Sequence, residues 1–393
     1  MDIVKKDSDV ILRANKLLKT TNKILKSYST DLVDTSWADK LYKWADKYEI
    51  PDTIFPRDRA KLLELTELNL TNLNLDYIPA EIGELKNLKG LYLGNNNLFT
   101  LPKEIGKLEN LRGLYLGHNK LEYLPDSIGE LKNLIALFLG HNYLSRIPES
   151  IGNLINLESL NISRNELFTI PKSINNLTNL AGLHLGRNHL KEIDISNLIN
   201  LEALYLGENR LTNIDLSNLE LLEEVYLNSN NLTTFPNIQN LRYIHKLSLG
   251  DNNIKTIPSD IKNLNYLEEL YLYSNEIEII PPEIGNLSSL VGLFLGSNKI
   301  KEIPKEIGNL KNLEELYLFG NEITRLPETI CKLEKLRKLD IYANKLTTLP
   351  DCIRNLVNIK KFDIQENNIS LTLHQKTYFE ELKTKGALIK GIE

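Results

Sequence analysis

The sequence predicts an α/β solenoid: a curved stack of short units with a parallel β-sheet on its concave face, short helices on its convex face and helical caps at its ends. Three observations predict this fold. The template L-x-x-L-x-L-x-x-N-x-L recurs fourteen times, its apolar residues alternate like those of a strand, and most copies continue into a proline-led turn. A unit of this size cannot bury its own leucines, so consecutive units must stack and share one core.

The fourteen copies are spaced with high regularity. Their first positions are Leu65, Leu88, Leu111, Leu134, Leu157, Leu180, Leu201, Leu222, Ile244, Leu267, Leu290, Leu313, Leu336 and Ile359. The interval is 23 residues except over 180–243, where two intervals of 21 and one of 22 occur. Units six and seven carry Asp194 and Asp215 where others have proline. A shorter convex side predicts a flatter segment there, although a neutral deletion explains the lengths equally well.

Each copy predicts a short strand with one buried face. In 111–116, Leu114 and Leu116 should point inward and Tyr115 outward. The template asparagine, which occurs thirteen times from Asn96 to Asn367, follows the strand. Its amide offers two donors and one acceptor, so it can satisfy backbone groups that would otherwise be buried without partners.

The second part of most copies predicts a short helical turn. In 101–108, Pro102 opens the turn and Glu104 favours its N-terminal end. Because this convex layer is bulkier than the spacing between strands, the stack should curve with its sheet on the inside.

These motifs resemble the leucine-rich repeat family over about residues 65–373. The L-P-x-x-I-G-x-L segment resembles the 23-residue class found in bacterial cytoplasmic or effector proteins and in intracellular Ras-pathway scaffolds, and units six and seven resemble the shorter repeats of a phosphatase-regulator class. The resemblance implies a horseshoe solenoid that binds proteins with its concave face. It does not identify the partner, because the fold hosts many unrelated functions.

The chain is therefore divided into an N-terminal helical region and cap (1–64), a repeat domain (65–373) and a C-terminal cap (374–393). Residues 1–27 form a basic amphipathic pattern without aromatic residues in its apolar stripe. This favours packing on another helix, or oligomerisation through residues 1–30, over membrane-surface binding. A second helical face, formed by Trp37, Leu41, Trp44 and Tyr48, is expected to cover the first repeat.

Composition excludes several classes of function. The chain has 393 residues, 42% of them hydrophobic, and a net charge of −5, which opposes general nucleic-acid binding. We find no secretory signal and no membrane-length apolar run. Cys331 and Cys352 lack paired neighbouring cysteines, which favours free thiols in a reducing compartment. We expect a cytoplasmic protein without integral membrane contact, with signal-independent export left open.

No motif predicts an enzyme. Phosphate loops, kinase motifs, nucleophile elbows and H-E-x-x-H pairs are missing from the sequence. His118 and His141 occupy the same template position in adjacent units and should lie one strand spacing apart. Arg164 continues their column, which disfavours a metal ion. We expect no catalytic residue, metal or cofactor.

The candidate ligand-binding residues face outward at the centre of the strands. The aromatic stripe consists of Tyr92, Tyr115, Phe138, His184, Tyr205, Tyr226, Tyr271, Phe294 and Tyr317. Small flanking residues such as Gly113 and Gly292 should leave these rings exposed beside shallow troughs. Exposed aromatic residues are typical of binding hot spots, although cross-strand packing in copied repeats would also explain them.

The charge of the side chains changes from basic to acidic along this face. Arg164 and Arg187 come first, and Glu208, Glu224 and Glu269 make the later half acidic. A partner of that half should present basic residues.

The sequence thus predicts a non-enzymatic scaffold that binds a protein or peptide on its concave face. Glycan binding by an exported protein is an alternative, because sugar rings also stack on tyrosine. A secreted effector targeted by its basic N-terminal helix is another.

Overall fold

The computed structural model describes residues 36–391, and the predicted amphipathic helix of residues 1–27 and the proposed oligomerisation segment lie outside them. The chain divides into one unit up to Glu49 and a second from Ile50 onward. In the first unit, α2 (Ser36–Lys47) buries Leu41 and Trp44. Trp37 and Tyr48 are half-buried. That this helix covers the first repeat stays a prediction.

The second unit begins with a capped helix, α3 (Arg59–Glu64). Asp58 precedes it in an extended conformation, and its side chain accepts a hydrogen bond of 2.9 Å from the backbone N–H of Lys61. This side-chain cap satisfies one of the free N–H groups at the start of the helix.

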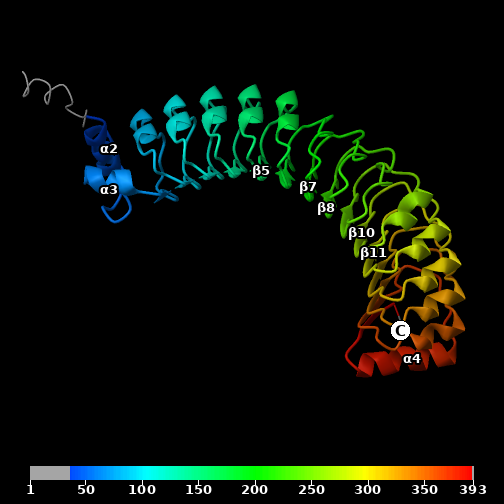
Figure 1. Ribbon diagram of the computed structural model, residues 1–393. Helices are drawn as coiled ribbons and strands as arrows, with labels where there is room; N and C mark the ends of the chain where they lie inside the picture. The colour runs from blue at the N-terminus through cyan, green and yellow to red at the C-terminus, as the bar shows by residue number, and fades with distance from the viewer. Residues whose placement is uncertain (1–35, 392–393) are drawn as a thin grey trace, which may run out of the picture. The chain divides into compact units, whose positions relative to one another are not determined.

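A single parallel sheet follows, in which strands pair in the order of the sequence. Within the described residues its fifteen strands are β1 (Glu67–Asn69), β2 (Gly90–Tyr92), β3 (Gly113–Tyr115), β4 (Ala136–Phe138), β5 (Ser159–Asn161), β6 (Gly182–His184), β7 (Ala203–Tyr205), β8 (Glu224–Tyr226), β9 (Lys246–Ser248), β10 (Glu269–Tyr271), β11 (Gly292–Phe294), β12 (Glu315–Tyr317), β13 (Lys338–Asp340), β14 (Lys361–Asp363) and β15 (Leu388–Lys390). Equivalent residues of neighbouring repeats pair, as Leu114 does with Leu137. The predicted parallel sheet is confirmed, and the strands line the inner side of the arc that this unit forms (Figure 1).

The outer side of the arc carries short 3-10 helices (Figure 1). They are η1 (Ala80–Glu84), η2 (Lys103–Lys107), η3 (Asp126–Glu130), η4 (Glu149–Asn153), η5 (Lys172–Asn176), η6 (Ser259–Asn263), η7 (Pro282–Asn286), η8 (Lys305–Asn309), η9 (Glu328–Lys332) and η10 (Asp351–Asn355). Residues 177–258 form none. There Asp194 and Asp215 replace the helix-opening proline, and each carboxylate accepts a hydrogen bond from the backbone N–H two residues later, at Ser196 and Ser217. The side chain makes the turn that proline starts elsewhere.

The repeats share one continuous core, held together at its edge by the template asparagines. Asn119 is typical: its Nδ2 donates to the carbonyl oxygens of Leu93 and Leu116, and its Oδ1 accepts from the N–H of Leu98. All three partners are buried backbone groups. The predicted role of this residue is confirmed, and each asparagine links its own repeat to the preceding one.

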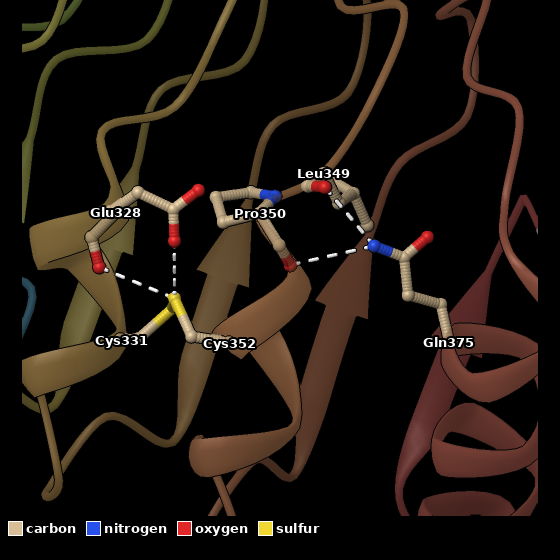
Figure 2. The surroundings of a disulfide bond; sticks show 6 residues. All are labelled: Glu328, Cys331, Leu349, Pro350, Cys352 and Gln375. Atoms are coloured by element: carbon tan, nitrogen blue, oxygen red, sulfur yellow. Dashed lines mark hydrogen bonds between the residues drawn. A yellow bond between two sulfur atoms is a disulfide. The ribbon is translucent and has the colours of Figure 1, made fainter.

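The expectation of free thiols is wrong. Cys331 and Cys352 form a disulfide with an S–S distance of 2.12 Å and a Cα–Cα distance of 5.8 Å (Figure 2). One cysteine follows the buried isoleucine of η9, and the other precedes the buried isoleucine of η10, so 21 residues separate them. Because the two cysteines are bonded to each other, they do not support the prediction of a reducing compartment.

The geometry of the convex turns explains this bond. Where Gly106 and Ser127 occupy the same two positions, a Cβ added to Gly106 would lie 2.9 Å from the Cβ of Ser127. Two side chains at these positions must therefore touch, and two cysteines there lie within bonding reach. Glu328 lies beside the bond, with its Oε2 3.0 Å from the sulfur of Cys352 (Figure 2).

The C-terminal end of the array is covered by α4 (Leu373–Thr384) and β15. Thr372 and Gln375 form a reciprocal capping box at the start of the helix. Gln375 Nε2 also donates to the carbonyl oxygen of Leu349 at 3.0 Å (Figure 2), and Phe379 lies 5.2 Å from the ring of Phe362. The sequence predicts the helix but not β15, which pairs with β14.

Candidate functional site

The aromatic stripe is divided into three stacks of three rings. Tyr92, Tyr115 and Phe138 form the first, His184, Tyr205 and Tyr226 the second, and Tyr271, Phe294 and Tyr317 the third. Centroids within the stacks lie 4.2–5.2 Å apart. Asn161 and Ser248 occupy the same position on the strands between the stacks. All nine rings are half-buried, because they cover one another.

The troughs expected beside the rings are filled. A Cβ added to Gly113 would lie 2.7 Å from Cε2 of Tyr115, and one added to Gly292 would lie 2.7 Å from Cε2 of Phe294. The rings of Tyr115 and Phe294 therefore lie back over the glycines two residues before them. The glycines provide room for stacking, and the rings present edges and parts of their faces to solvent.

The three acidic residues of the predicted site are paired within the protein. Glu208 accepts from Arg187 Nε at 2.6 Å, and Glu224 accepts from the hydroxyl of Tyr205 at 2.5 Å. Glu269 lies 2.5 Å from Lys246 Nζ and also accepts from Tyr271. Each of these three carboxylates already has an internal partner. These positions therefore do not support the expectation that the later half attracts a basic partner.

Arg164, Arg187 and Glu208 lie where two hollows meet. One hollow of about 270 Å³ lies over the second ring stack and is lined by these residues together with His184, Tyr205 and Tyr226. The other, of about 850 Å³, is a groove lined by residues just beyond the strands β3–β7. Six predicted site residues thus come together around one continuous surface, whereas the first and third stacks lie at other repeats.

His118 and His141 line the larger groove as a stacked pair. Their ring centroids lie 3.9 Å apart, as expected from their shared template position. Burial, together with the positive charges of His118, Arg164 and Arg187, lowers the pKa of His141. Within residues 36–391 no three histidine, cysteine or acidic side chains cluster as metal ligands would.

Sequence reasoning missed two parts of this face. The groove also contains Lys120, Glu166, His189 and Arg210, which follow template asparagines. Further aromatic rings lie on the concave face two residues after the central position of the strand. There Tyr273 and Phe319 cover Gly250 and Gly296 of the preceding repeats. The sequence carries the signal for both as columns of equivalent positions beside the central column of the strands.

Family models of the leucine-rich repeat match several segments of the chain. One matches residues 64–121 and 110–167, a second matches 266–287, and a model of a leucine-rich repeat region matches 293–385. A comparison with curated proteins gives no match.

Solved structures show the same architecture. A leucine-rich repeat protein of Leptospira interrogans is 34% identical with a TM-score of 0.68, and the match covers 84% of this chain and 98% of that one. The plant peptide hormone receptor RGFR1, solved in complex with RGF2, is 33% identical with a TM-score of 0.71; the match covers 81% of this chain and 54% of the receptor. The functional domain of InlJ from Listeria monocytogenes, which includes a cysteine ladder, is 22% identical with a TM-score of 0.69 and matches over 79% and 69%. This last likeness concerns the fold alone.

One negative result bears on the membrane. None of the helices formed by residues 36–391 has the length and apolar character needed to span a bilayer.

Proposed function

The chain belongs to the leucine-rich repeat family, and from this premise we propose that it is a non-enzymatic scaffold that binds a protein or peptide on the concave face of its sheet. The fold and its relatives support protein binding in general. To this general class we add the concave face as the binding surface, the residues that line it and the absence of a catalytic role.

The observation that carries the proposal is the continuity of the second ring stack with the neighbouring groove. His184, Tyr205 and Tyr226 supply half-buried rings, and Arg164 and Arg187 supply charge at the border of the same hollow. Aromatic and arginine side chains dominate the energetics of protein interfaces, since they bury large areas and form directional contacts. A surface about five repeats long suits an extended peptide or a protein edge.

The relatives support the same class of ligand. The plant receptor was solved with a peptide hormone bound, and this chain aligns with about half of that receptor. We extend to this chain only the class of ligand, a peptide or protein. Nucleic acid is excluded from the proposal because the net charge of −5 opposes binding of a phosphate backbone.

The test is affinity capture from native lysate with the intact protein and with a triple variant of the second ring stack that carries His184→Ala, Tyr205→Ala and Tyr226→Ala. The matched control carries Tyr243→Ala and Tyr266→Ala, which remove exposed rings outside the strands. Proteins retained by the intact chain and the control but lost from the triple variant would support the proposal. We expect at least a tenfold weaker affinity of the purified partner for the triple variant.

Identical capture by all three proteins, combined with a lower stability of the triple variant alone, would contradict the proposal. The rings would then serve only to pack neighbouring strands, at about 0.5–1.5 kcal/mol per stacked pair. Urea unfolding of the three proteins separates these outcomes, because it measures the packing contribution directly.

A further inference from the structure

The groove beside β3–β7 carries excess positive charge in an acidic protein. Four permanent cations line it, Lys120, Arg164, Arg187 and Arg210, against two carboxylates, Glu166 and Glu208. His118, His141 and His189 line it as well, whereas the chain as a whole has a net charge of −5. The groove is therefore a local exception that attracts anions.

The pairing of these charges leaves one part of the groove without an anion. Arg187 is bound to Glu208 at 2.6 Å, and His189 is bound to Glu166 at 2.8 Å. Among residues 36–391, Arg164 forms no ion pair or side-chain hydrogen bond, and the stacked pair His118 and His141 has no acidic partner. These three adjacent side chains carry N–H donors, and no carboxylate among the described residues accepts a hydrogen bond from them.

The backbone at these positions is costly for such residues. His118, His141, Arg164, Arg187 and Glu208 all have positive φ, between 54° and 59°. Glycine adopts this conformation without steric cost and occupies the equivalent position of a later repeat, at Gly320 with φ of 63°. A side chain with a Cβ atom is disfavoured in the left-handed region by steric contact with the backbone. The same conformation recurs at this template position in other repeats, from Asn95 to Glu366, so it belongs to the repeat and fixes where these side chains leave the backbone.

Exposed aromatic residues flank the same groove. Tyr143, which lines it, is 57% exposed, and Phe168, whose ring lies 5.1 Å from that of His189, is 54% exposed. Lys120 lies over the ring of Phe99 at 5.7 Å. Exposed rings for apolar contact are thus available within the groove and beside it.

We propose that this groove anchors an acidic segment of the partner protein, with Arg164 as the central contact and Arg187, His118 and His141 beside it. The inference rests on the proposed function and specifies the chemistry of the partner. Carboxylate side chains would accept hydrogen bonds from the Arg164 guanidinium, and apolar residues between them would contact Tyr143 and Phe168. We favour a protein segment over RNA, because a peptide can place apolar side chains between its carboxylates, opposite Tyr143 and Phe168, and the net charge of −5 opposes binding of a long phosphate backbone.

The experiment uses the purified full chain and a fluorescently labelled oligoglutamate peptide, measured by anisotropy at low salt. We expect saturable binding that weakens with added salt and falls at least about tenfold in Arg164→Gln, because charge-assisted hydrogen bonds are lost. The matched control is Lys345→Gln, which removes a cation of a later repeat that is already paired with Glu322 at 2.8 Å. It should bind as the intact chain does.

Three results would overturn the assignment: equal binding by Arg164→Gln, equal binding of an oligolysine peptide, or tighter binding of single-stranded polyuridylate than of oligoglutamate. The partner captured from lysate separates this inference from the proposed function. Capture that survives Arg164→Gln but is lost in the triple ring variant overturns the anchoring groove alone. A chain that binds oligoglutamate through Arg164 but captures no protein overturns the scaffold function alone.

Discussion

The two halves of the repeat array use their charged residues differently. From β8 onward, charges on neighbouring strands pair with one another, as Lys246 does with Glu269 at 2.5 Å and Lys338 with Glu315 at 2.7 Å. Along β3–β7, by contrast, Arg164 and the His118–His141 pair have no acidic partner among the described residues. Arg187 and His189 in the earlier half are paired as well, so the difference between the halves is concentrated at Arg164 and the two stacked histidines.

Aromatic rings do not distinguish the halves. One ring stack lies on β2–β4, one on β6–β8 and one on β10–β12, with similar spacing between centroids. A stripe of rings therefore indicates how the sheet packs as much as where it binds. The contrast between paired and unpaired charge gives the sharper indication of a binding surface.

Loss of the disulfide should have the largest effect on stability. The bond lies in the later half of the array, where charged residues pair between neighbouring strands. The variant Cys331→Gly, Cys352→Ser recreates the pair found at Gly106 and Ser127. We expect the free energy of unfolding to fall by about 3 kcal/mol, because the bond closes a short loop in the unfolded chain. Urea unfolding with and without reductant measures this change.

Binding of oligoglutamate is the control for the disulfide variant, and it should not change. A wild-type protein whose urea midpoint is the same with and without reductant would contradict the stabilising role of the bond. Loss of oligoglutamate binding in the variant would contradict the separation of the two halves.

The pair Lys246–Glu269 gives a smaller effect that depends on pH. Lys246→Met should lower the free energy of unfolding at neutral pH by about 1 kcal/mol. Although burial raises the pKa of Glu269, hydrogen bonds from Lys246 and Tyr271 lower it overall. A lowered pKa stabilises the fold above the ordinary value of 4.5, and this contribution is lost as the pH falls through the folded-state pKa. Urea unfolding as a function of pH should show a shallower acid loss in the variant.

Arg164→Met is the matched change in the earlier half. It removes a cation with no acidic partner, so the loss of stability through the carboxylate range should match that of the intact chain. The pKa of His141, which burial and neighbouring positive charges including Arg164 lower, should rise in this variant. An equal loss of stability in both variants would remove the distinction between paired and unpaired charge.

The smallest expected effect compares two residues with positive φ. Arg164→Gly and Ala343→Gly relieve similar backbone conformations, with φ of 54° and 51°. Each should raise the free energy of unfolding by about 0.5–1 kcal/mol, since the left-handed conformation is cheap only for glycine. Only Arg164→Gly should lose oligoglutamate binding. Thermal unfolding and anisotropy measure both quantities, and stabilisation without loss of binding in both variants would show that Arg164 is not kept for a ligand.

The sequence by itself determined the features that repeat within one unit. Leu114 and Leu116 are buried, Tyr115 faces outward and Asn119 satisfies buried backbone groups, as the template predicts. The column of aromatic residues and the adjacent histidines were also predictable, because equivalent positions of stacked repeats must be neighbours. Local periodicity fixes these features, since the same pattern is imposed on every strand.

Only the tertiary structure decided the contacts between non-equivalent positions of neighbouring repeats. The bond between Cys331 and Cys352 joins different template positions, so their spacing of 21 residues in a 23-residue period concealed it. The pairing of Glu224 with Tyr205, the rings lying over glycines and the groove around Arg164 likewise depend on side-chain direction and on the distance between repeats. A period in sequence states which residues are equivalent, but side chains of finite length reach across positions, and their geometry decides which charges are paired and which remain free.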